Sequence, residues 1–201
     1  MSRAARWIGA LGIAVLGLWG GAAQAAISQQ LGWAQQYANP AYPSGTVANY
    51  TVGAGTNRIL VVGISATSTA AGGVTCSTVS YGGTNLTLAA GDGASTVTWN
   101  HTFFYYLKDT PAVMDGTSRP LNVTCSGGTG YYTWVFAAVY AGVDQTTPLT
   151  DSRNYNSATA DTAVGPFSPT LTINANDQAI ESNMANFSFV FDTSPPTGYL
   201  I

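Results

Sequence analysis

Alternation of apolar and polar positions is the strongest pattern in the chain after residue 26, and it predicts β-strands. Residues 96–107 alternate most clearly. One face of that segment carries Val97, Trp99, His101, Phe103, Tyr105 and Leu107. The other face begins with threonine and asparagine, and a period of two is the signature of a half-buried strand. Leu121, Val123 and Cys125 alternate with polar residues in the same way.

Two segments are apolar without interruption, which predicts strands that are covered on both faces. Residues 59–64 read Ile-Leu-Val-Val-Gly-Ile. Residues 131–143 are longer and apolar on both faces. The large side chains of that segment, Tyr132 and Trp134, fit core positions.

Turn residues separate these segments. The pair Gly82-Gly83 lies between two short apolar stretches, and because glycine tolerates positive φ we expect a tight hairpin there. Later strands are indicated at Leu171/Ile173 and at Phe187, Phe189 and Phe191, after a polar connection over residues 144–169. The total of eight or nine strands predicts an all-β, antiparallel β-sandwich of the jelly-roll or Ig-like kind. Residues 27–38 fit a helix and a strand equally well, since Gly32 interrupts the helical pattern.

The N-terminus has the three parts of a secretory signal peptide. Arg3 and Arg6 precede an uncharged apolar run over residues 7–21, and Ala23-Gln24-Ala25 provides a small-x-small cleavage pattern. The run is shorter than the roughly 20 residues of a membrane span. We therefore expect residues 1–25 to be removed on export, and residues 26–201 to form one secreted or cell-surface domain without a stable membrane span. An uncleaved membrane anchor is the alternative.

The low charge of the chain argues against one class of binding partner, nucleic acids. Charged residues are only 7% of the chain, which has 201 residues and a net charge of −3. Without residues 1–25, four basic residues face nine acidic ones, so the net charge becomes −5. Neutralising phosphates needs clustered Lys and Arg, so the composition argues against a nucleic-acid partner.

Four phrases resemble a β-sandwich module that recurs in large secreted and surface-attached bacterial proteins. The most specific is the Gly-Val-Asp-Gln-Thr-Thr-Pro run that begins at Gly142. The other three are Asn57-Arg58-Ile59-Leu60-Val61-Val62-Gly63, Val79-Ser80-Tyr81-Gly82-Gly83, and Tyr105-Tyr106-Leu107 followed by Pro111. The resemblance covers about residues 46–191 and implies a fold and an extracellular location. It brings no catalytic residues and no established activity.

Cys76 and Cys125 are the two cysteines of the chain. A cysteine pair in an exported protein is usually a disulfide, so we expect these residues to be bonded to each other. Two buried free thiols are the alternative.

The polar residues that carry chemistry in other proteins are sparse. His101 is the only histidine, and its place on an apolar strand face indicates a packed residue rather than a metal ligand or general base. Glu181 is the only glutamate, so a glycosidase pair would use it with an aspartate, or use two aspartates. The candidate aspartates all lie in predicted turns: Asp109, Asp115, Asp144, Asp151, Asp161, Asp177 and Asp192. We expect no catalytic, cofactor or metal site, with calcium bound by turn carboxylates as the alternative.

Aromatic residues provide the remaining functional signal. Five of them are candidates for a surface on which sugar rings stack: Trp33, Trp99, Trp134, Tyr131 and Tyr132. The leading hypothesis is a non-enzymatic extracellular module with a structural, adhesive or assembly-subunit role. A carbohydrate-binding module is the second hypothesis, with polysaccharide as partner, and an aspartate-dependent hydrolase is the third.

The C-terminal end of the sandwich is expected to be incomplete. Pro195 and Pro196 follow the Phe187–Phe191 strand closely, and too few residues remain before Ile201 for another strand, so the domain is interpreted as truncated there. An unpaired edge on that strand can accept a strand from another chain. Residues 27–31 are the expected donor, so the sequence predicts self-association by strand addition. Pairing of this segment within its own chain is the alternative.

Overall fold

A computed structural model describes residues 26–39, 43–68, 74–91, 100–127, 130–152, 180–185 and 188–192. All regular structure in these ranges is β. The strands are β1 (Ser28–Asn39), β2 (Ser44–Thr51), β3 (Ile59–Ser68), β4 (Thr75–Tyr81), β5 (Thr84–Asn85), β6 (Thr87–Gly91), β7 (Asn100–Lys108), β8 (Ser118–Ser126), β9 (Gly130–Ala141), β10 (Glu181–Ala185) and β11 (Ser188–Asp192). The predicted signal peptide, the proposed Leu171/Ile173 strand and Trp99 lie outside the described residues.

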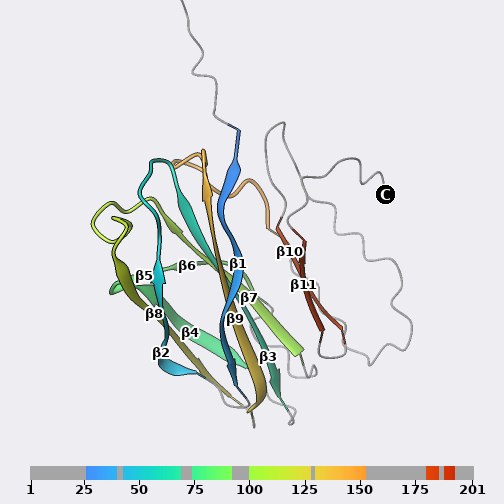
Figure 1. Ribbon diagram of the computed structural model, residues 1–201. Coiled ribbons are helices and arrows are strands. Elements are labelled where there is room, and N and C mark those ends of the chain that lie inside the picture. The colour runs from blue at the N-terminus through green and yellow to red at the C-terminus, as the bar shows by residue number, and fades with distance from the viewer. Residues whose placement is uncertain are drawn as a thin grey trace, which may run out of the picture.

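Nine of these strands form two antiparallel sheets that pack as a β-sandwich (Figure 1). The five-stranded sheet has the order β1-β9-β3-β7-β6, and the four-stranded sheet has the order β2-β8-β4-β5. The predicted fold class is therefore confirmed. β10 and β11 pair with each other in a separate two-stranded sheet beside the sandwich. The strand expected at Phe187–Phe191 thus pairs with β10 and joins neither sandwich sheet.

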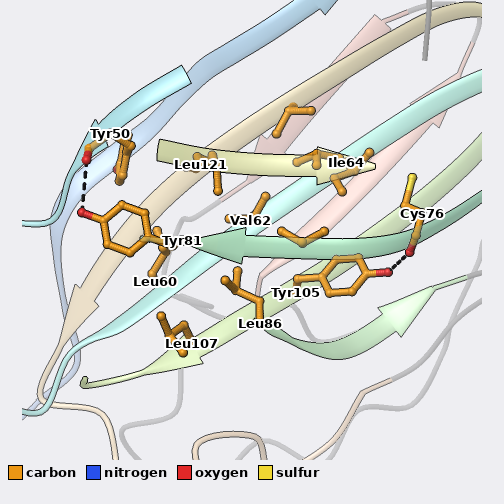
Figure 2. Packing of buried hydrophobic residues seen from close by; sticks show 14 of the residues in the cluster. Tyr50, Leu60, Val62, Ile64, Cys76, Tyr81, Leu86, Tyr105, Leu107 and Leu121 are labelled. Atoms are coloured by element: carbon orange, nitrogen blue, oxygen red, sulfur yellow. Dashed lines mark hydrogen bonds between the residues drawn. The ribbon is translucent and has the colours of Figure 1, made fainter. Parts of the chain in front are cut away.

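The main core lies between the two sheets (Figure 2). β3 contributes Leu60, Val62 and Ile64 from the five-stranded sheet, and each is at most 1% exposed. β8 contributes Leu121 from the facing sheet. Fully burying such a side chain is worth about 1.5–3 kcal/mol, so this layer supplies most of the driving force for folding. The alternation predicted for residues 96–107 is confirmed over its described part, because His101, Phe103, Tyr105 and Leu107 are all buried.

A second apolar cluster covers the outer face of the five-stranded sheet. Ile59 and Val61 of β3 pack there with Ala138 and Tyr140 of β9, and Ile180, just before β10, packs against them. β3 is consequently covered on both faces, as its uninterrupted apolar sequence predicts. Burial raises the pKa of Tyr140 to about 12, although hydrogen bonds with Trp33 and Gln29 act in the opposite direction.

A two-residue turn joins β4 to β5. Gly82 and Gly83 have φ of +56° and +83°, and the turn brings Tyr81 opposite Thr84. Positive φ at both central residues is the type I′ geometry that glycine favours, so the predicted tight hairpin is confirmed. The chain then passes from the four-stranded sheet to β6 in the five-stranded sheet.

Tyr81, at the end of β4, forms hydrogen bonds with the backbone at the end of β2, which is an edge strand of the same sheet. Its hydroxyl donates to the carbonyl of Tyr50 at 3.1 Å (Figure 2). The same hydroxyl accepts from the amide of Val52 at 3.2 Å. Both interactions are buried, which makes them strong positional constraints.

The N-terminal segment is a strand, which decides between the helical and extended interpretations of residues 27–38. β1 forms one edge of the five-stranded sheet and pairs with β9 of the same chain. The segment expected to be donated to another chain is therefore already paired within its own. Three register shifts interrupt this pairing, and each places one extra residue in β1.

Candidate functional site

Three of the four phrases that carry the resemblance contribute to a polar cluster at one end of the sandwich, and residues 79–83 are not part of it. Arg58 directly precedes β3, Asp109 follows β7, and Gln145 follows β9. Arg58 is only 2% exposed, and its Nη2 lies 2.7 Å from Oδ1 of Asp109, which is 12% exposed. Arg58 also donates to Oδ2 of Asp109 from Nε at 3.4 Å and from its backbone amide at 3.2 Å. We refer to Arg58, Asp109 and Gln145 as the Arg58 lock.

Gln145 completes the lock because its amide group bridges all three strand ends. Its Nε2 donates to the carbonyls of Arg58 and Val143, both at 3.0 Å. Its Oε1 accepts from the backbone amide of Asp109 at 2.8 Å. The guanidinium of Arg58 additionally donates to the carbonyl of Gly53. Charge pairing and hydrogen bonding together compensate the desolvation of the buried Arg58.

Local backbone geometry places these residues. Asn57 has φ of +54°, a left-handed conformation that asparagine tolerates better than most residues. Its carbonyl accepts from the amide of Val143 at 3.0 Å. Asp144 then closes the following turn, accepting from the Thr146 amide at 2.8 Å and the Thr147 hydroxyl at 3.0 Å. The Thr146 amide is the main cause that lowers the pKa of Asp144.

Sequence reasoning recognised these phrases but did not identify Arg58 or Gln145 as parts of one site. The available signal was the low charge of the chain, which makes an arginine directly before a buried strand unusual. A lone glutamine amide carries no such signal. The structure explains the specific Gly-Val-Asp-Gln-Thr-Thr-Pro run. Its aspartate, Asp144, closes a turn, and its glutamine, Gln145, is part of the Arg58 lock.

The predicted disulfide is present. Cys76 of β4 and Cys125 of β8 are directly opposite each other in the antiparallel register and are joined by a 2.05 Å S–S bond. Both residues are buried, and the hydroxyl of Tyr105 donates to the Cys76 carbonyl (Figure 2). The bond therefore links two strands of the four-stranded sheet, while Tyr105 reaches across from the five-stranded sheet.

His101 is fully buried on the inner face of β7, next to the main core. This position agrees with the packed interpretation of the residue. Within the described ranges, no group of three His, Cys, Asp or Glu side chains is arranged to hold a metal ion.

Asp109 and Asp115 have separate local roles. Asp109 belongs to the Arg58 lock. Asp115 accepts from Nη2 of Arg119 at 2.8 Å and from the Thr117 amide at 3.0 Å, and these bonds, Arg119 first, hold its pKa well below the usual range. Asp161 and Asp177 lie outside the described residues.

One register brings two of the predicted carboxylate residues together. Glu181 of β10 is opposite Asp192 of β11, at the open end of that two-stranded sheet.

Three of the five candidate sugar-stacking residues lie in described strands of one sheet with defined ring contacts. Tyr132 and Trp134 of β9 are half-buried and stack with ring centroids 4.3 Å apart and planes at 35°. Trp33 of β1 makes an edge-on contact with Phe104 of β7 at 6.3 Å. Tyr131 belongs to β9 by its backbone.

The expectation that Tyr132 and Trp134 occupy core positions was wrong. Val135, Ala137 and Val139 point into the main core, so the even-numbered residues of β9 face outward. Alternation separates the two faces of a strand, but both faces of β9 are apolar, and the pattern alone does not tell which one faces the other sheet. A sugar would meet the outer faces of the stacked pair, because the inner faces contact each other.

Comparison with known proteins adds no relative. No protein-family model matches the sequence, and no curated protein or solved structure matches it significantly. In the part of the chain that the structure describes, no helix has the length and apolarity needed to cross a membrane.

Proposed function

We propose that this protein is a non-enzymatic, extracellular or cell-surface β-sandwich module with a structural, adhesive or assembly-subunit role. The observation that carries the proposal is the Arg58 lock. It uses a buried arginine, an aspartate and a glutamine to join three strand ends, so two of the chain's few charged residues stabilise the fold. Residues from separate phrases of the sequence meet in this one structural cluster.

The disulfide supports the extracellular part of the proposal. Disulfides persist in oxidising compartments, and this one is buried inside the fold rather than exposed for exchange. It fits the signal peptide expected at residues 1–25 and the resemblance to surface-attached bacterial modules.

Location can be tested on intact cells. We expect an antibody to detect the protein in the medium or on unpermeabilised cells, with its first residue at Ala26 and no free thiol at Cys76 or Cys125. A cytoplasmic protein that begins at Met1 and has two free thiols would overturn the extracellular assignment.

The structural or adhesive role predicts a stoichiometric dose response. Cells that lack the gene should lose adhesion or surface integrity, and purified protein added from outside should restore it in proportion to the surface sites occupied. An enzyme turns over, so full restoration by trace amounts of protein would contradict the non-enzymatic assignment.

Carbohydrate binding is a second candidate, supported by the half-buried Tyr132–Trp134 stack. If it is correct, the purified protein is retained on a polysaccharide resin. The variant Tyr132→Ala/Trp134→Ala should then elute with the void volume. Leu88→Ala, which changes an exposed apolar residue on the far edge strand β6, is the matched control and should bind normally. Equal retention of all three proteins would exclude the stacked pair as the binding site.

A further inference from the structure

The two sides of the sandwich end in strands of very different length. On one side the edge strands are β6, with five residues, and β5, with two. On the other side they are β1, with twelve residues, and β2, with eight, and these two strands contact each other. Short strands are one of the ways in which proteins protect a sheet edge from pairing with another chain. The side formed by β1 and β2 does not have that protection.

Charge does not protect this side either. No charged residue occurs between Ala26 and Asn57, and β1 contains no proline. In β1 no side chain is buried, and Leu31 is 38% exposed. Lysine and proline on edge strands are the usual obstacles to edge-to-edge pairing. An uncharged partner strand meets no electrostatic penalty here.

The sequence of β1 has an approximate two-fold pattern. It reads Ser-Gln-Gln-Leu-Gly-Trp-Ala-Gln-Gln-Tyr-Ala-Asn, with Gln29-Gln30 and Gln35-Gln36 placed symmetrically about the bond between Gly32 and Trp33. Two antiparallel copies of this strand, related by a dyad at that bond, would place Gln30 opposite Gln35 twice and Gln29 opposite Gln36 twice. Each amide side chain has both donors and an acceptor, so such pairs are self-complementary.

The residues around this dyad allow close approach. Gly32 has no other atom within 4 Å of the position of a Cβ, and Ala34 is small and exposed. The extra residues of β1 make its edge irregular, because they twist the strand. The middle register shift, between Leu31 and Ala34, lies at this dyad, so a second copy of β1 matches it there, whereas a regular peptide strand does not.

We propose that a second copy of this chain pairs with β1 along its outer edge, antiparallel and with the dyad between Gly32 and Trp33. The two five-stranded sheets then form one continuous ten-stranded sheet. A dyad perpendicular to the sheets is an isologous arrangement, the commonest symmetry of protein dimers. It also brings the β2 edges of the two four-stranded sheets to the same side. The inference deepens the assembly role in the proposed function, on which it rests for its biological purpose.

Charge-swapped variants test the dimer and its register together. In Gln30→Lys/Gln35→Lys, two pairs of like charges would face each other across the dyad, and in Gln30→Glu/Gln35→Glu the same holds with opposite sign. Both altered positions, Gln30 and Gln35, are exposed, so the fold should be unaffected. Leu88→Lys places the same kind of charge on an exposed leucine of β6, at the other edge of the same sheet.

Sedimentation velocity of the exported, disulfide-bonded chain is the measurement. We expect a concentration-dependent dimer for the unaltered chain and for Leu88→Lys. Each charge variant alone should have a dimer dissociation constant raised about tenfold or more, and an equimolar mixture of the two should recover the dimer. A monomeric unaltered chain, a dimer insensitive to either charge variant, or a mixture that stays monomeric would each overturn the proposal. None of these results depends on where the protein is located, so they leave the extracellular assignment to its own test.

Discussion

Removing the carboxylate of Asp109 is expected to destabilise the protein strongly. In Asp109→Ala, Arg58 loses its 2.7 Å ion pair and the two further bonds to Oδ2. The guanidinium is 2% exposed in the unaltered chain, so the variant leaves a buried charge without its carboxylate partner. Breaking a buried ion pair from one side costs about 3–5 kcal/mol, which is a large part of the free energy of unfolding of a typical domain.

Two further variants separate the buried charge from lost packing. Asp109→Asn keeps one acceptor oxygen for Arg58, so it should cost less, about 1–3 kcal/mol. Arg58→Met/Asp109→Ala removes both charges and keeps apolar volume at position 58. It should recover most of the stability that Asp109→Ala loses, because apolar replacement of a buried ion pair is often close to neutral.

Equilibrium urea unfolding at neutral pH, with the disulfide intact, is the assay. The midpoint should fall in the order unaltered chain, Asp109→Asn, Asp109→Ala, with an unchanged m-value. If Asp109→Ala lies within about 0.5 kcal/mol of the unaltered chain, the lock does not stabilise the sandwich. A double variant less stable than Asp109→Ala would show that the cost comes from packing rather than from the unpaired charge.

Three other features give predictions of known direction. Cys76→Ala/Cys125→Ala opens a loop with a sequence separation of 49 and should cost about 4 kcal/mol in urea unfolding, whereas an unchanged midpoint would contradict the chain-entropy argument. Burial, and then Tyr81, raises the pKa of Tyr50 from 10.0 to about 12, so the unfolded chain releases this proton first and stability should fall between pH 10 and 12. Tyr50→Phe should reduce that loss in an alkaline stability series, and an identical slope would refute the assignment. Gly82→Ala should cost at least about 1–2 kcal/mol in thermal unfolding, because φ is +56° and the new Cβ would lie 2.8 Å from the side chain of Arg119. Gly32→Ala, which meets nothing within 4 Å, is its control and should be nearly neutral.

The alternation of the sequence predicted the inner faces of the strands well. Phe103, Tyr105 and Leu107 are buried together as expected, because a period of two directly reports which side chains share a face. It did not reveal which sheet a strand joins. β5 and β6 are separated by Leu86 alone and belong to different sheets, and this change depends on long-range pairing with β4 and β7.

The candidate site was less predictable for the same reason. Arg58, Asp109 and Gln145 are far apart in the sequence, and they meet because β3 pairs with both β7 and β9. The disulfide was predictable because only one pairing of two cysteines exists. β1 was ambiguous because its exposed, glutamine-rich sequence has no strong apolar periodicity, and its pairing partner β9 decided the outcome.

The position of the disulfide determines how the protein would respond to a pulling force. Cys76 and Cys125 enclose β5, β6 and β7, so a force applied at the two ends of the domain passes through the S–S bond and not through those strands. The enclosed 49-residue separation corresponds to about 165 Å of extended chain that cannot be released while the bond is oxidised. The loop closed by the disulfide contains β5 of the four-stranded sheet and β6 and β7 of the five-stranded sheet, so it includes strands of both sheets. A module held at a surface would therefore lengthen much less under tension than its number of residues suggests, and reducing agents would act as a switch on its extensibility.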